Sequence, residues 1–196
     1  MFIVLYGINN LGKSTQAHLL VERLNKEGHD AEYIKYPRYE ITPTGHIINA
    51  YLREGNPLHL SKREFQLFNA LNRTQYEPEL KQKLDAGVIM VGEDYTGSGL
   101  AWGIGTGVDE QFMKTINDHL LKENLAFVFD GNRFTEATES DHTHENDVEL
   151  QEHVRSVYTQ LGQEFGWLLV NANRTREAIH EQIWDSVRQK LDSLVD

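Results

Sequence analysis

The sequence predicts an α/β protein in which helices cover both faces of a doubly wound, parallel sheet. Short apolar runs alternate with amphipathic helical segments over the whole chain. Most of these runs are continuous rather than alternating, as is typical of strands buried on both faces. The length of 196 residues, with 39% hydrophobic and 25% charged residues, is that of a single globular domain over residues 1–196.

Five strands are expected, because five runs combine strand length with apolar, β-branched or aromatic residues. In chain order they are Phe2–Tyr6, Ala31–Tyr36, Val88–Val91, Leu125–Phe129 and Trp167–Val170.

Helices are expected between these strands, where apolar residues recur at spacings of three and four. In the first helix the recurring residues are Ala17, Leu20, Val21 and Leu24, and Gly28 ends it. The other predicted helices are Arg63–Leu84, broken near Pro78, then His153–Gln163 and Glu177–Leu191.

Charge and cysteine content exclude several classes of protein. With 19 basic and 30 acidic residues the net charge is −11, which disfavours a surface that binds nucleic acid. There is no cysteine, so disulfides, thiolate zinc sites and thiol nucleophiles are excluded. No apolar run approaches the ~20 residues that span a bilayer, and no signal peptide is recognisable. We expect a cytoplasmic protein that binds neither nucleic acid nor membrane.

One segment differs in composition from the rest of the chain. Residues 134–154 contain no lysine or arginine, but acidic residues crowd there. A solvated acidic loop leading into a helix explains this composition. The functional alternative is a small lid over a bound ligand, near residues 131–150.

The motif with the most specific chemistry directly follows the first predicted strand. Residues 7–15 read G-I-N-N-L-G-K-S-T and match G-x-x-x-x-G-K-S, with a strand before and a helix after. Glycines let backbone N–H groups wrap around phosphate oxygens, and the helix N-terminus favours the same anion. We expect Lys13 to neutralise the β- and γ-phosphates and Ser14 to ligate Mg²⁺. The predicted phosphate site comprises Gly7, Asn9, Asn10, Leu11, Gly12, Lys13, Ser14 and Thr15.

This P-loop favours a small kinase over other nucleotide-binding proteins. A GTPase needs an N-K-x-D guanine motif, which the sequence lacks. A motor or helicase ATPase normally needs a longer chain. One P-loop and a substrate region at the midpoint of a short chain point to a kinase that acts on a small phosphorylated molecule.

Two segments offer side chains to an acceptor. Tyr36–Tyr39, which contains Arg38, follows the second strand, and side chains at the carboxyl end of a parallel strand face the ligand crevice. On the next helix, Arg73 can form paired hydrogen bonds with a base carbonyl or a phosphate, and Phe68 can offer its ring to a base. The structural alternatives are core packing for Phe68 and a surface ion pair for either arginine.

Glu93 and Asp94 end the third predicted strand, beside the P-loop. Carboxylates there can position Mg²⁺ or accept a proton from the attacking group. Neighbouring side chains on an extended chain point in opposite directions, so only one of the two is expected to face the metal. We assign metal ligation to Ser14 and Glu93; a turn with solvated acids is the alternative.

Together these motifs resemble the thymidylate kinase family over nearly the full length of the chain. The family's F-I-x-x-E-G-x-D-x-x-G-K-S-T-Q matches residues 2–16, its F-P-x-R or F-P-R-Y segment matches residues 36–39, and its aromatic followed by D/N-R matches residues 68–73. Its D-R-Y-x-x-S-x-x-A-Y/F segment aligns without a gap to Glu93–Trp102. His153–Tyr158 and Val170–Asn173 resemble its final substrate helix and its adenine-contacting loop.

The resemblance implies a three-layer P-loop NTPase fold with a five-stranded parallel sheet, a homodimer, and the reaction ATP + dTMP → ADP + dTDP. Lys13, Glu93 and Arg133 are the expected catalytic residues, with Arg133 as the nearby candidate to offset transition-state charge, and the resemblance implies contact of Asn173 with ATP. It also implies an acceptor site made of Tyr36, Arg38, Phe68, Asn69, Arg73, Asp94, Tyr95, Ser98, Trp102 and Tyr158.

Several positions depart from the family pattern, and three of them bear on the acceptor. The arginine of D-R is Asp94, the P-loop aspartate is Asn9, and the aromatic residue four positions before Arg73 is Asn69. Phosphorylation of dTMP is the leading hypothesis. One alternative is a kinase for a deoxynucleoside or a modified nucleotide, because Glu93 resembles the E-R-S segment of deoxynucleoside kinases. The other is a degenerate member that binds nucleotide without efficient transfer.

Overall fold

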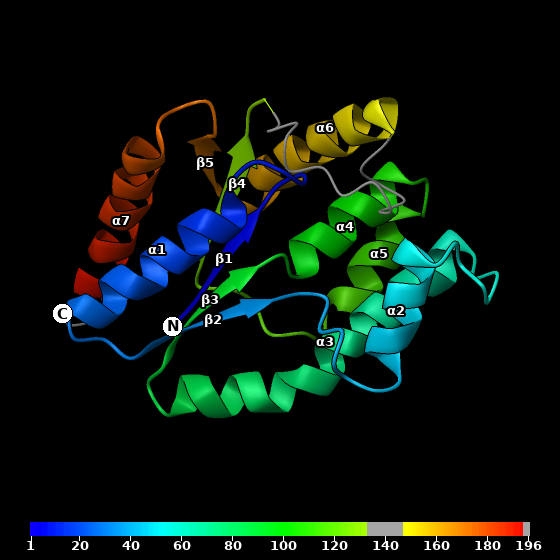
Figure 1. The fold of residues 1–196 in the computed structure, drawn as a ribbon, viewed down its shortest axis with the longest axis horizontal. Coiled ribbons are helices and arrows are strands. Elements are labelled where there is room, and N and C mark those ends of the chain that lie inside the picture. Colours follow the sequence, from blue (N-terminus) through cyan, green and yellow to red (C-terminus); the bar gives the residue numbers. More distant parts are fainter. Residues whose placement is uncertain (133–146, 194–196) are drawn as a thin grey trace.

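The computed structural model describes residues 1–132 and 147–193. Its centre is a five-stranded parallel sheet with the order β2-β3-β1-β4-β5 (Figure 1). The strands are β1 Phe2–Tyr6, β2 Ala31–Lys35, β3 Ile89–Glu93, β4 Leu125–Asp130 and β5 Leu168–Asn171. Each expected strand is present with its bounds shifted by two residues at most, so the predicted α/β fold class is confirmed.

Parallel pairing places the carboxyl ends of all five strands at one edge of the sheet. β1 lies between β3 and β4 and is buried along its whole length. The register sets Glu93 of β3 beside Leu5 of β1 on one side and beside Lys35 of β2 on the other. The P-loop, which follows β1, therefore lies next to the carboxylates at the end of β3.

Helices cover both faces of this sheet. In the described residues they are α1 Lys13–Lys26, α2 Thr44–Arg53, α3 Lys62–Asp85, α4 Thr96–Gly105, α5 Glu110–Asn117, α6 Val148–Phe165 and α7 Arg176–Asp192. α1 and α7 pack together on one face, where α1 contacts β1, β2 and β3 (Figure 1). On the other face α3 contacts β3, α6 contacts β4, and α4 packs against both helices.

The helices differ from the expected ones in two respects. The sequence pattern does not predict α2, α4 or α5. The predicted break near Pro78 is wrong, because α3 runs through Pro78 as one helix. Tyr76 and Leu80, on either side of Pro78, are both buried, and this packing outweighs the hydrogen bond that proline removes.

A small apolar cluster accompanies the main core around the sheet. It lies between α2 and α3, and Phe65 of α3 stacks there on Tyr51 of α2 with ring centroids 3.8 Å apart. The buried members are Ile48, Leu52 and Phe65, against which Tyr39, Tyr51 and Phe68 pack. This cluster braces α2 and α3 beside the carboxyl edge of the sheet.

None of the helices in the described part of the chain has both the length and the apolar character that crossing a bilayer requires. The expected lid near residues 131–150 falls mostly on residues 133–146, including Arg133, which lie outside the described residues.

Candidate active site

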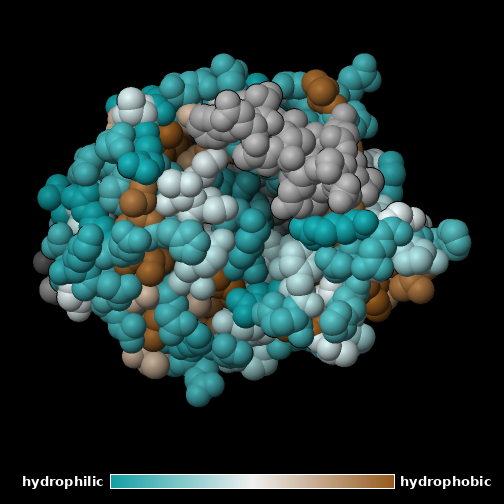
Figure 2. Space-filling model, viewed as in Figure 1, coloured by the Kyte–Doolittle hydropathy of each residue, from teal (hydrophilic) through white to brown (hydrophobic). Residues whose placement is uncertain are grey.

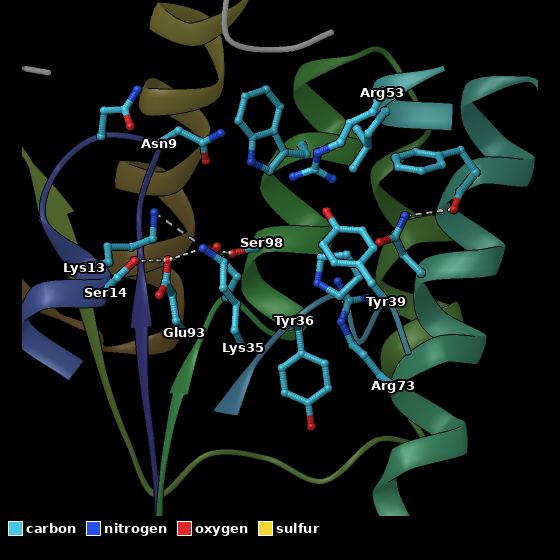
Figure 3. A pocket seen from close by; sticks show the side chains of 18 of the residues that line it. Asn9, Lys13, Ser14, Lys35, Tyr36, Tyr39, Arg53, Arg73, Glu93 and Ser98 are labelled. Atoms are coloured by element: carbon cyan, nitrogen blue, oxygen red, sulfur yellow. Dashed lines mark hydrogen bonds and ion pairs between the residues drawn. The ribbon is translucent and has the colours of Figure 1, made fainter. Parts of the chain in front are cut away.

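A cavity of about 480 Å³ lies at the carboxyl edge of the sheet (Figure 3). Its walls come from the P-loop, from the ends of β2 and β3, and from α2, α3 and α4. The face of the molecule shown in Figure 2 is mainly hydrophilic. Open α/β sheets bind their ligands at this edge, so the cavity is the candidate active site.

The P-loop is shaped to hold an anion. Gly7, Asn10 and Gly12 have φ angles of +137°, +64° and +83°, which side chains with a Cβ rarely adopt. A Cβ on Gly7 would lie 2.8 Å from the carbonyl oxygen of Phe129 in β4. Among the described residues no side chain caps the N-terminus of α1, and its first turn holds no acid. The N–H groups and the positive dipole end of α1 therefore remain open to a phosphate.

Lys13 keeps a positive charge at this loop. The side chain is buried, and its Nζ donates hydrogen bonds of 2.9 Å to the carbonyl oxygens of Gly7 and Ile8. The same Nζ lies 3.8 Å from Oδ1 of Asp94. The loop therefore holds the ammonium group close to the place where a phosphate would bind.

Glu93 is the centre of a polar network. Its Oε1 accepts a hydrogen bond of 2.9 Å from Ser14 Oγ and lies 3.0 Å from Lys35 Nζ. Its Oε2 accepts a hydrogen bond of 2.6 Å from the Tyr33 hydroxyl. Burial raises the pKa of Glu93, but Lys13, Lys35 and the two hydroxyl donors lower it by more, so the net pKa lies below its ordinary value. Glu93 is therefore ionised at neutral pH.

Asp94 contacts a different set of residues from Glu93. Its backbone is left-handed, with φ of +57°, and its Oδ1 accepts a hydrogen bond of 2.7 Å from Ser98 Oγ. The hydroxyl of Tyr158 in turn donates to Ser98 Oγ at 2.9 Å. Burial raises the pKa of Asp94, and the charge of Lys13 offsets only part of this rise. Of the two carboxylates Glu93 is the one that contacts Ser14.

Arg73 marks the other end of the cavity. The residue is 5% exposed, and its Nη1 donates to Oδ1 of Asn117 at 3.2 Å. Within the described residues its Nε has no hydrogen-bond partner and the guanidinium forms no ion pair with a carboxylate. Burial lowers the pKa of Arg73. A buried cation with a neutral partner and an open donor favours an anionic or carbonyl ligand in the cavity.

Most of the predicted site residues line this cavity. They are Asn9, Asn10, Gly12, Lys13, Ser14, Thr15, Tyr36, Asn69, Arg73, Glu93, Asp94, Ser98 and Trp102. Gly7 lies beneath the P-loop against Phe129. The side chain of Leu11 is buried in the main core. Gly7 and Leu11 therefore shape the P-loop without lining the cavity.

Three predicted acceptor residues do not line the cavity. The guanidinium of Arg38 lies 4.6 Å from the ring centroid of Tyr76 and pairs with Glu40. Phe68 packs in the small apolar cluster, because Phe65, Asn69 and Arg73, spaced four residues apart, form the face of α3 that meets the cavity. Tyr95 is buried in the main core, against Phe2 and Tyr36.

Tyr158 and Asn173 do not line the cavity either. Tyr158 lies behind its wall and holds Ser98. Asn173, after β5, accepts a hydrogen bond of 2.7 Å from the backbone N–H of Asn132. Arg133 lies outside the described residues.

Sequence reasoning missed several residues that line the cavity, among them Lys35, Tyr39 and Arg53. Lys35 is the last residue of β2, so the rule that ligands bind at the carboxyl ends of parallel strands could have identified it. Arg53 ends α2, a helix that the pattern does not predict, and no sequence signal marks it.

Comparison with known proteins gives a consistent result. A solved structure of thymidylate kinase from Candida albicans has the same fold, with a TM-score of 0.80 over 96% of this chain and 91% of that chain at 21% identity. The thymidylate kinase of Halothermothrix orenii is 31% identical over 202 residues, which cover 96% of each chain. The human thymidylate kinase is 33% identical over 194 residues, 92% of this chain and 86% of the relative. A sequence model of the thymidylate kinase family matches residues 5–183. The P-loop, the cavity and these matches agree, and the chain belongs to the thymidylate kinase family.

Proposed function

We propose that the protein transfers the γ-phosphoryl group of ATP to dTMP, which gives ADP and dTDP. One observation carries the proposal: a single cavity joins the P-loop at one end to the buried Arg73 at the other. Phosphoryl transfer between two nucleotides requires such a shared enclosure, because catalysis depends on holding both phosphates in place. The relatives named thymidylate kinase support dTMP as the acceptor.

At the donor end the backbone N–H groups of residues 12–15 bind the phosphates of ATP. Lys13 exchanges the carbonyl oxygens of Gly7 and Ile8 for phosphate oxygens, whose negative charge makes them stronger acceptors. Asn173, on the loop after β5, contacts the adenine.

The oxygen donors of Ser14 and Glu93 fit Mg²⁺. Hydroxyl and carboxylate oxygens are hard ligands, and Ser14 Oγ and Glu93 Oε1 are 2.9 Å apart. We assign these two residues to the ion, which when bound neutralises phosphate charge. Tyr33 holds Glu93 in place through its other oxygen.

Catalysis rests on positioning and on stabilisation of charge. A phosphate oxygen of dTMP attacks the γ-phosphorus, and the new P–O bond forms as the bond to the β,γ-bridging oxygen breaks. The attacking phosphate dianion carries no proton that must be removed. Arg73 orients the acceptor, and Asn69, Ser98 and Trp102 line the cavity beside it.

A kinase for an unphosphorylated deoxynucleoside is the second candidate, and Asp94 favours it. This carboxylate lines the cavity, and burial raises its pKa. A carboxylate at this place repels an acceptor phosphate but can accept a proton from a sugar hydroxyl.

Release of ADP across a panel of acceptors distinguishes the candidates. With ATP and Mg²⁺ we expect turnover with dTMP, weaker turnover with dUMP and other nucleoside monophosphates, and none with thymidine. Turnover with thymidine but not with dTMP would establish the second candidate. Nucleotide binding without turnover of any acceptor would identify a degenerate family member.

We further propose that the protein is a cytoplasmic homodimer, the assembly that the family resemblance implies. Light scattering coupled to size-exclusion chromatography at high concentration measures its mass. A mass twice that of the 22.6 kDa chain is expected, and the mass of a single chain would contradict the proposal.

A further inference from the structure

Lys35 contacts the same oxygen atom of Glu93 that the proposed metal ion would bind. The Nζ of Lys35 lies 3.0 Å from Oε1 of Glu93, and the same Oε1 accepts the hydrogen bond from Ser14. The other oxygen of Glu93 is held by the hydroxyl of Tyr33. Since Oε2 is held in this way, Glu93 has one oxygen to offer to a cation from the cavity, and Lys35 already pairs with it.

Lys35 is able to leave this position. Its side chain is 52% exposed, and its charge is carried at the end of a flexible four-carbon stem. A metal ion bound directly to Oε1 would repel the ammonium group and replace it as the partner of Glu93. The side chain of Lys35 projects into the same cavity that Arg73 lines (Figure 3), so phosphates bound there are within the range of its stem.

The middle of the cavity needs a cation once a phosphorylated acceptor enters. Asp94 adds a negative charge to the cavity wall close to Lys13 and Glu93. Lys13 is bound to the P-loop, and Arg73 is fixed at the other end by Asn117. Lys35 is the half-exposed lysine that lies between them (Figure 3).

We propose that Lys35 has two alternative partners: Glu93 in the metal-free protein, and the phosphate of the acceptor once a divalent cation occupies Ser14 and Glu93. The ammonium group thus occupies the position of the metal ion in the metal-free protein and binds the acceptor phosphate once the metal is present. The inference rests on the proposed function, because it takes the Ser14–Glu93 metal site and a phosphorylated acceptor from it.

Metal binding in the absence of nucleotide tests whether Lys35 and the metal compete for Glu93. Mn²⁺, which also prefers hard oxygen ligands, is titrated into the protein, and free Mn²⁺ is followed by electron paramagnetic resonance. Lys35→Gln removes the competitor, so we expect it to bind Mn²⁺ about fivefold more tightly than the wild type. Lys35→Arg keeps the positive charge and should stay within about twofold of the wild type.

Binding of dTMP, measured by calorimetry with saturating Mn²⁺ and again with a chelator, tests the second partner. We expect the wild type to bind dTMP more tightly with the metal than without it. Lys35→Gln should lose this difference and bind dTMP about tenfold more weakly than the wild type in the presence of Mn²⁺. Thermal melting of each variant confirms that it is folded.

Arg53→Gln is the matched control, because Arg53 lines the same cavity but lies apart from Glu93 (Figure 3). It should leave the affinity for Mn²⁺ within about twofold of the wild type. The inference is overturned if Lys35→Gln does not tighten Mn²⁺ binding, if Arg53→Gln tightens it equally, or if Lys35→Gln binds dTMP as the wild type does. A wild type that binds no dTMP at all would instead contradict the proposed function, and with it the acceptor phosphate as a partner of Lys35. The Mn²⁺ titration would still test whether Lys35 and the metal compete for Glu93.

Discussion

Lys13 and Arg73 are both buried cations at the candidate site, but their surroundings differ. Lys13 donates to two backbone carbonyl oxygens of its own loop. Arg73 has the neutral side chain of Asn117 as a partner and an open Nε. Holding these charges away from water costs free energy in the empty protein. Anionic ligands recover part of this cost, which is how a site becomes pre-organised for phosphate chemistry.

Replacement of Lys13 by alanine should nearly abolish turnover. The variant loses the charge that stabilises the transferring phosphoryl group, and kcat/KM should fall by about 100-fold or more. Steady-state assays of ADP release with dTMP measure this. Lys26→Ala is the control, because Lys26 is exposed in the last turn of the same helix, and it should retain wild-type activity. Near-normal activity of Lys13→Ala would contradict the role of the P-loop.

Arg73→Gln should weaken acceptor binding far more than Arg38→Gln. Arg73 lines the cavity, and its loss should raise the KM for dTMP by about tenfold or more. The guanidinium of Arg38 pairs with Glu40 over the ring of Tyr76, so its loss should change KM by less than about threefold. Equal effects of the two substitutions in initial-rate kinetics would show that the arginines act together on the acceptor.

The sequence predicts those residues of the candidate site whose positions follow from a local sequence pattern. Residues 12–15 follow from the spacing of the P-loop, and Glu93 follows from its place at the end of a strand. The choice between Arg38 and Lys35 depends on tertiary partners, since the ring of Tyr76 and the carboxylate of Glu93 direct the two side chains to different places. Phe65 and Phe68 also lie at different angles around the axis of α3. This difference decides that Phe65, and not Phe68, lines the cavity.

At the scale of elements, α4 shows most clearly why part of the fold escapes prediction. Its glycines at positions 97, 99, 103 and 105 each cost about 1 kcal/mol of helix propensity relative to alanine. Packing explains them, because neighbouring helices and strands approach this helix closely. A Cβ on Gly97 would lie 2.5 Å from the ring of Trp167, and one on Gly105 would lie 2.5 Å from Val154. Long-range contacts of this kind leave no periodic signal in the sequence.

Gly97→Ala should destabilise the protein despite the better helix propensity of alanine. The new Cβ would meet the rings of Trp167 and Tyr6 at 2.5 and 2.8 Å, and overpacking of this kind costs about 1–3 kcal/mol. Gly162→Ala in α6 is the control, since its nearest neighbour would be 3.2 Å away, and we expect its stability to lie within about 1 kcal/mol of the wild type. Urea unfolding gives both free energies. A stabilised Gly97→Ala would show that α4 is less tightly packed than described.

At the scale of the whole molecule, the described segments that line the cavity lie between Asn9 and Trp102. The later elements β4, β5, α6 and α7 complete the sheet and its two covering layers. The number of strands could be predicted from apolar runs alone, and the motif resemblance implied the fold. The way that α2 and α3 close the cavity depends on the small apolar cluster between them, which no local pattern shows.

Ligand binding at the cavity should stabilise the entire fold. ATP with Mg²⁺ at 100 times its Kd adds about 2.7 kcal/mol to the free energy of unfolding, which for a domain of this size raises Tm by about 5–10 °C. Differential scanning calorimetry with and without the nucleotide measures the shift. Lys13→Ala should lose most of it at the same concentration, and an unchanged wild-type Tm would contradict ATP binding at the P-loop.

The central position of β1 has a consequence for the order in which the chain folds. β1 precedes the other four strands in the sequence, yet Phe2 pairs with Met90 and Ile3 pairs with Leu125. A ribosome must therefore release the chain beyond Leu125 before β1 gains both of its neighbours. Pairing across such sequence separations is slow, so the nascent N-terminal third exposes its apolar first strand until the downstream strands arrive. The phosphate-binding loop, which leaves β1 directly, takes shape late, although it is encoded in the first fifteen residues.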